Sequence, residues 1–149
     1  MVRVIQFGVA GAVVALMLVG CAGGSEDTTS PTLSKKEFVR KANARCEKVG
    51  KEVLVEVRAI TTSTKQRRTA ETEKLLAEAA LPIYREMIQD VKTLGNPAGE
   101  KEQAESIYDA FEKQLDAVEE KPGLLSNGTE TFNKPNQLAR KFGINMCQL

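Results

Sequence analysis

Three stretches of the chain place an apolar residue at every third or fourth position, which is the period of one face of an α-helix. These stripes run through residues 38–60, 76–94 and 104–118, and charged side chains fill most of the positions between the apolar ones. We therefore expect three long amphipathic helices that bury their stripes against one another.

Local signals predict where the helices begin and end. Ser34 and Glu37 form an S-x-x-E capping box, in which each side chain satisfies a backbone N–H. Threonine and serine residues at 61–64 end the first helix, and either Ser63 or Thr69 caps the second. The Gly-Asn-Pro sequence at 95–97 ends the second helix.

The rest of the chain predicts a third helix, a loop and a short fourth helix. The third helix runs from about 98 to 120, the loop covers 123–131, and the fourth helix lies within 132–142, restarts at Pro135 and stops at Gly143. Pro82 interrupts the second stripe, so the second helix is either kinked near 78–81 or broken in two. The valine-rich segment 53–57 resembles a strand, but Leu54 and two glutamates disturb its alternation. We expect an all-α fold: a small antiparallel helical bundle of three long helices and one short C-terminal helix.

The N-terminus has the features of a bacterial lipoprotein signal. An apolar run at 7–19 follows the single charge of Arg3, and Leu18-Val19-Gly20-Cys21 forms a lipobox, whose cysteine is acylated and becomes the first mature residue. We expect a signal peptide at 1–20, a flexible tether at 21–33 and a helical domain at 34–149. An uncleaved membrane helix at 4–22 is the alternative. Either way the domain lies on the extracytoplasmic face of the cell membrane, and acylated Cys21 anchors it in the lipid.

The three cysteines suggest one disulfide. If Cys21 carries lipid, Cys46 and Cys147 remain as an even pair in an exported protein. We expect these two to form a disulfide that joins the first helix to the end of the chain. The alternative is two unpaired thiols, with Cys46 buried as a small apolar residue.

Charge is balanced overall but unevenly distributed. The net charge is +1, and removal of Arg3 with the signal peptide leaves it at zero, so no global field attracts nucleic acid. Residues 34–51 hold seven basic and two acidic side chains, whereas residues 100–120 hold eight acidic and two basic ones. Either these two helices pack side by side, or the basic helix lies over anionic lipid headgroups. The cations that would contact the headgroups are Lys35, Lys36, Arg40 and Lys41.

Catalysis is not expected. The chain has no histidine, which excludes Ser-His-Asp and Cys-His nucleophiles and imidazole metal sites, and the acidic residues of the third helix surround its apolar stripe in solvated positions. We predict no cofactor and no metal site. The basic cluster at 65–68 is interpreted as a solvated helix start, and Tyr84 and Tyr108 as packing at the edge of the core.

The leading interpretation is a non-enzymatic binding or interaction module for an unknown partner. The alternative is a carrier of a small ligand, in which the second helix, kinked near Pro82, opens a pocket between helices. The residues expected at that pocket are Pro82, Ile83 and Met87.

Three segments add a resemblance to these patterns. FVRKANARC at 38–46, LGNP at 94–97 and LARKFGINMC at 138–147, together with the lipobox and tether, make the chain similar to a broad group of small exported actinobacterial lipoproteins. Their function is generally undescribed. The likeness covers nearly the whole mature chain, although Phe142 stands where a tyrosine is expected. It implies export and the pairing of Cys46 with Cys147.

Overall fold

The computed structural model describes residues 32–65, 67–145 and 147, and these residues are predominantly helical and contain no strand. The expected signal peptide, Cys21 and most of the expected tether lie outside the described residues. The helices are α1 (Lys35–Ser63), α2 (Ala70–Lys92), α3 (Lys101–Glu120), the 3-10 helix η1 (Pro122–Asn127), α4 (Gly128–Thr131) and α5 (Asn133–Phe142).

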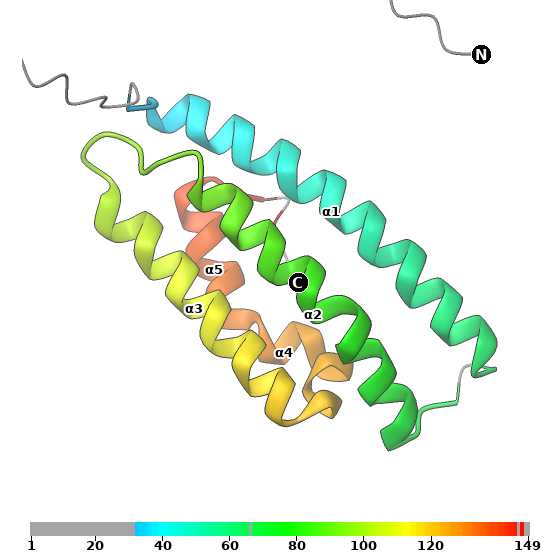
Figure 1. Ribbon diagram of the computed structural model, residues 1–149. Coiled ribbons are helices and arrows are strands. Elements are labelled where there is room, and N and C mark those ends of the chain that lie inside the picture. The colour runs from blue at the N-terminus through cyan, green and yellow to red at the C-terminus, as the bar shows by residue number, and fades with distance from the viewer. Residues whose placement is uncertain (1–31, 66, 146, 148–149) are drawn as a thin grey trace, which may run out of the picture.

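The two longest helices, α1 and α2, lie side by side along most of their length (Figure 1). The opposite side of α2 packs against α3 and η1, and α5 packs against α3. The predicted stripes form one core, in which Phe38, Cys46, Met87, Phe111 and Leu115 are buried. None of the helices among the described residues is both long and apolar enough to cross a membrane.

The predicted ends of α1 are confirmed, but its capping box is only half formed. The Ser34 hydroxyl oxygen accepts a hydrogen bond from the backbone N–H of Glu37 at 3.3 Å, as expected. The Glu37 carboxylate, however, accepts a bond from the Ser34 hydroxyl at 3.0 Å. Of the two candidate caps of α2, Thr69 is the correct one, because its hydroxyl oxygen accepts from the backbone N–H of Thr72 at 3.1 Å.

Helix α2 is not broken at Pro82. It continues from Ala70 to Lys92 with the proline inside it. Pro82 lies on the exposed face, whereas Leu81 and Met87 are buried in the core. Packing of the apolar face therefore holds the helix together across the position where proline removes one backbone hydrogen bond.

Two further boundaries differ from the prediction. Helix α3 begins at Lys101, three residues later than expected, because the preceding turn contains Gly99 with a φ of +74°. The segment expected as a loop is helical, since η1 and α4 occupy it and α5 begins directly afterwards. Leu124 packs against the core, and its carbonyl accepts a hydrogen bond from the Thr131 hydroxyl at 2.9 Å. These contacts fold the segment back onto itself.

Gly143 ends α5 as predicted. Its φ of +107° is left-handed, and its backbone N–H bonds to the carbonyl of Ala139 at 3.1 Å. The chain then turns toward α1.

Candidate functional site

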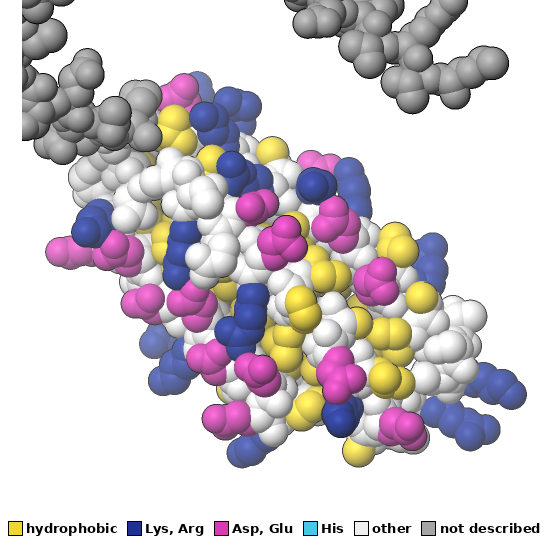
Figure 2. Space-filling model, in the orientation of Figure 1, with side chains coloured by type: hydrophobic (Ala, Val, Ile, Leu, Met, Phe, Trp, Pro, Cys, Tyr) yellow, Lys and Arg dark blue, Asp and Glu magenta, His cyan; other side chains and the backbone are white. Residues whose placement is uncertain are grey.

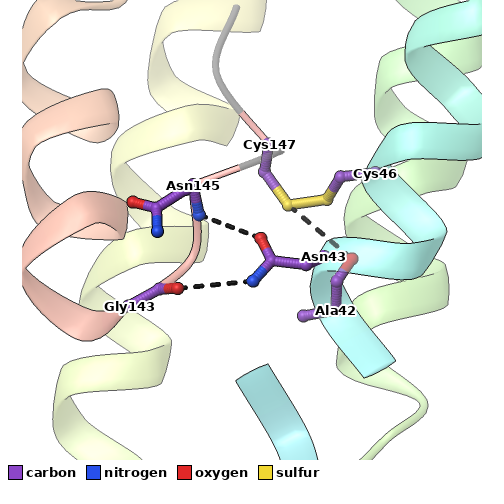
Figure 3. Close-up of a disulfide and its surroundings, with 6 residues drawn as sticks. All are labelled: Ala42, Asn43, Cys46, Gly143, Asn145 and Cys147. Atoms are coloured by element: carbon purple, nitrogen blue, oxygen red, sulfur yellow. Dashed lines mark hydrogen bonds between the residues drawn. A yellow bond between two sulfur atoms is a disulfide. The ribbon is translucent and has the colours of Figure 1, made fainter. Parts of the chain in front are cut away.

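The predicted cysteine pair closes one end of the molecule. Cys46 of α1 and Cys147 lie at disulfide-bonding distance, with their Cα atoms 4.8 Å apart (Figure 3). Asn43, one turn earlier in α1, holds the same tail: its side-chain amide donates to the carbonyl of Gly143 at 3.3 Å and accepts from the N–H of Asn145 at 2.9 Å. The end of the described chain is therefore fastened to the first half of α1.

Aromatic and ionic contacts strengthen this closed end. The Phe38 and Phe142 rings meet edge to face, with centroids 5.9 Å apart, and Lys35 Nζ lies 4.5 Å from the centroid of Phe142. Lys35 also forms an ion pair with Glu100 at 3.0 Å. Of the four cations expected to face lipid, Lys35 is thus engaged within the protein.

The other three cations of that group lie at the surface of α1. Lys36 and Arg40 are exposed, and Lys41 is half-buried. None of the three forms an ion pair with an acidic residue of the described part of the chain. Their charge remains available to an external anion.

The acidic residues of α3 pair with α2 and not with the basic helix α1. Arg85 bonds to Asp116 and Glu119, both at 2.8 Å, and Lys92 bonds to Glu112 at 2.6 Å. The expectation that α1 packs against α3 through complementary charge is therefore wrong. Helix α2 packs against both α1 and α3 instead. Lys35 of α1 still pairs with Glu100, which precedes α3.

The three residues of the predicted pocket do not line one cavity. Pro82 is exposed, Ile83 borders a hollow of about 50 Å³ beside α1, and Met87 borders a space of about 20 Å³ beside Cys46. Pro82 lies on the exposed face of α2, so it opens no space between α2 and the neighbouring helices.

A much larger cavity of about 550 Å³ lies farther along α2, toward its N-terminus. It is bounded by the last turns of α1, the first half of α2, and η1 with the residues that follow it. Its apolar wall consists of Val57, Leu76, Ala80, Tyr84, Leu125 and Phe132.

The cavity lies beyond the part of α1 that the end of α5 and the tail contact. Helix α5 has 10 residues and α1 has 29, so they are about 15 Å and 44 Å long. The last turn of α5 lies beside Phe38, and the tail covers α1 as far as Cys46. Beyond that point α1 packs mainly on α2, and a cavity separates it from η1.

Two arginines and one glutamate line the cavity at the α1–α2 connection. Both arginines are exposed, and Arg68 donates to the backbone carbonyl of Ser126 at 3.1 Å. Glu73 accepts from the Ser126 hydroxyl at 3.3 Å. Figure 2 shows basic side chains projecting from the end of the molecule where α1 joins α2. The sequence interpretation of this cluster as a solvated helix start missed that Arg67 and Arg68 line the cavity.

Most threonine hydroxyls of the cavity are occupied by their own helices. Thr61 donates to the carbonyl of Val57 at 2.8 Å, and Thr64 donates to that of Ile60 at 2.9 Å. The Thr72 hydroxyl shares a hydrogen bond with that of Thr69 at 3.0 Å. The guanidinium groups therefore keep unused donors at the α1–α2 connection, and the Tyr84 hydroxyl lies farther along α2.

The two tyrosines differ in their surroundings. Tyr84 lines the cavity, and burial raises the pKa of its hydroxyl. Tyr108 belongs to the core, with its hydroxyl buried and without a hydrogen-bond partner among the described residues. Burial, followed by the charge of Glu105, raises the pKa of Tyr108 to about 12. Both hydroxyls thus remain protonated at neutral pH.

In the described ranges, no group of three or more histidine, cysteine, aspartate or glutamate side chains is arranged to hold a metal ion. Comparison of the chain with protein-family models, with curated proteins and with solved structures finds no match.

Proposed function

We propose that this protein is a non-enzymatic, lipid-anchored binding protein on the extracytoplasmic face of the cell membrane, and that it carries a small ligand in the cavity between α1, α2 and η1. The observation that carries this proposal is the cavity itself. Its volume of about 550 Å³ falls within the range of roughly 300–1,000 Å³ typical of small-molecule sites. Its apolar wall ends in a few polar groups, as such sites commonly do.

The proposed architecture is an antiparallel helical bundle in which the fourth segment, α5, is much shorter than α1. The short connections between α1, α2 and α3 support reversal of the chain at each turn. In this arrangement α5 and the tail cover half of α1, and the ligand would take the place of the missing half. We assign no catalytic role, because the chain has no histidine and Glu112, Asp116 and Glu119 of α3 are ion-paired.

The lipid anchor rests on the lipobox. Mass spectrometry of protein extracted from membranes should find Cys21 as the first residue, carrying acyl chains, and Cys21→Ser should remain unprocessed. An N-terminus before Cys21 in the wild-type protein would instead support an uncleaved helix. The same spectra without reductant should show no alkylatable thiol at Cys46 or Cys147.

The closed end is proposed to face the membrane. The tether precedes α1, so the first turns of α1, with exposed Lys36 and Arg40, lie nearest to the anchor. The last turn of α5 adds the exposed Arg140 and Lys141 at the same end. We expect the non-acylated helical domain, produced without the signal peptide, to bind vesicles containing phosphatidylglycerol but not neutral vesicles. Substituting Lys36 and Arg40 by glutamate should abolish this binding, and equal binding to neutral vesicles would contradict it.

Ligand carriage can be tested with a photoactivatable probe. The mature lipoprotein in phosphatidylcholine nanodiscs would be irradiated with a diazirine-bearing dodecanol, and labelled peptides identified by mass spectrometry. We expect labelling in α2 around Leu76–Tyr84. Thr61→Phe, which projects into the cavity, should suppress it, whereas Thr62→Phe on the exposed face of the same helix should not. Equal labelling of both variants would refute the cavity as the binding site.

A protein-interaction role remains the second candidate. It is favoured by two large apolar side chains at the surface of α1, Leu54 at 58% exposure and Val55 at 66%. Cross-linking in the native membrane, compared between wild type and a Leu54→Ser/Val55→Ser variant, tests this role. A partner captured equally by both proteins would exclude this surface.

A further inference from the structure

We infer that the cavity binds a single-chain amphiphile with a carboxylate head, such as a fatty acid, whose head lies between Arg67 and Arg68. This inference names the ligand class of the cavity and therefore rests on the proposed function. It rests on the shape of the cavity, the placement of its charges and the hydrogen bonds that its other polar groups already form.

The cavity is long in relation to its volume. Along α2 it is lined from Thr72 to Tyr84, a span of about 18 Å at the helical rise per residue. An elongated cavity of this kind can take an extended hydrocarbon chain lying along α2.

Polarity changes from one end of this length to the other. The two arginines and Thr72 lie at the α1–α2 connection, whereas Ala80, Tyr84 and Phe132 line the cavity farther along α2. A ligand that satisfies both ends has a charged head and an apolar body. Burial of the body supplies most of the binding free energy, and the head fixes the orientation.

The net charge at the polar end is positive, and its two arginines are not ion-paired. Neither Arg67 nor Arg68 forms an ion pair with an acidic residue of the described chain. Arg68 uses one Nη2 donor for the Ser126 carbonyl, and a guanidinium has five N–H donors in all. The remaining donors of the two arginines match the two oxygens of a carboxylate.

Glu73 limits the ligand to a single negative charge. Its carboxylate faces η1, where it accepts from the Ser126 hydroxyl, and one oxygen lies 2.9 Å from the position that a side-chain Cβ on Gly123 would occupy. Two arginines and one glutamate leave a net charge of +1 on the lining. A carboxylate carries one negative charge, whereas a phosphate monoester carries about −1.5 to −2 at neutral pH.

The test uses the mature lipoprotein in neutral phosphatidylcholine nanodiscs and three diazirine probes of equal chain length: dodecanoate, dodecanol and dodecylammonium. Each variant is compared with wild type for the same probe, so that differences in partitioning into the bilayer cancel. The variants are Arg67→Gln/Arg68→Gln and, as a matched control, Arg58→Gln on the exposed surface of α1. Circular dichroism confirms that each variant is folded.

We expect the double variant to reduce dodecanoate labelling of α2 about tenfold or more, because it removes charge-assisted hydrogen bonds. It should leave dodecanol labelling unchanged, and Arg58→Gln should affect neither probe. Undiminished dodecanoate labelling in the double variant would overturn the carboxylate assignment while leaving a neutral-ligand carrier intact. Preferential labelling by dodecylammonium would overturn it as well and identify Glu73 as the recognising group. Absence of α2 labelling by all three probes would refute both this inference and the carrier itself.

Discussion

The two halves of α1 carry the same kind of apolar stripe but have different neighbours. In the first half, Phe38 and Cys46 are fully enclosed by α2, α5 and the tail. In the second half, α2 covers one side only, and Val57 and Thr61 border the cavity. Asn43 and Thr61 share a face of the helix, about five turns apart. One of them binds the tail, and the other lines the open space.

Under the proposed function, this difference separates stability from ligand binding along one helix. The first half contains the long-range covalent link, the aromatic pair and the asparagine bridge, all of which join residues about a hundred positions apart. The second half lacks such links among the described residues, and one side of it borders the cavity. We expect the free energy of unfolding to depend mainly on the first half and ligand binding on the second.

Removal of the disulfide should have the largest effect. The two cysteines are separated by 101 positions, and for a loop of that size the chain-entropy account gives about 4–5 kcal/mol. Cys46→Ala/Cys147→Ala should therefore lower the free energy of unfolding by about that amount in urea titrations, and reduction of the wild-type protein should do the same. If reductant left the unfolding midpoint unchanged, the disulfide would contribute nothing to stability, and packing alone would stabilise the first half of α1.

Substitution of two leucines, one in the core and one at the cavity, compares the packing of the two regions. Leu115 is fully buried in α3, whereas Leu76 is half-buried and faces the cavity. Leu115→Ala should cost about 2–5 kcal/mol, because it creates a void in close-packed surroundings. Leu76→Ala should cost less than half as much, since one side of that leucine already lacks packing partners. Equal losses in chemical unfolding would mean that the cavity closes around Leu76 in solution.

The helices were predictable because their signals are local. Ser34, Thr69 and Gly143 mark ends through hydrogen bonds and backbone angles within one turn, and the 3.6-residue period identifies which face is apolar. The 3-10 helix η1 was missed because it depends on packing of Leu124 against a distant part of the chain. Of the two outcomes predicted at Pro82, the break is wrong, because Leu81 and Met87 of the same helix are buried in the core and the helix continues through the proline.

The cavity was not predictable, because it depends on how far a partner extends along α1. Val49 and Val57 belong to the same apolar stripe, yet Val49 is buried and Val57 borders the cavity. The pocket predicted at Pro82, Ile83 and Met87 is wrong for the same reason: the apolar pattern does not show which part of a stripe is left uncovered. One sequence feature points toward the cavity: Arg67 and Arg68 form a basic pair in the short connection between the first and second apolar stripes.

Two glycine substitutions should have opposite effects. Gly143 has a φ of +107°, so Gly143→Ala imposes strain on the turn that begins the closed tail and should cost about 1–2 kcal/mol. Gly50 lies inside α1, and a Cβ added there would meet no atom within 4 Å, so Gly50→Ala should gain about 0.5–1 kcal/mol through helix propensity. Thermal and urea unfolding measure both changes. A destabilising Gly50→Ala would show that this surface of α1 is covered in solution.

The two tyrosines should respond differently to alkaline pH. The raised pKa of Tyr108 keeps its proton in place to about pH 12, whereas an unfolded tyrosine loses it near pH 10. The unfolded state therefore binds fewer protons above about pH 10, and the free energy of unfolding falls as the pH rises from there. Urea titrations across that range should show a decline that Tyr108→Phe largely removes. Tyr84→Phe should remove less of it, because Tyr84 borders the cavity. If Tyr108→Phe left the decline unchanged while Tyr84→Phe abolished it, the half of the molecule identified as open would be the better sealed one.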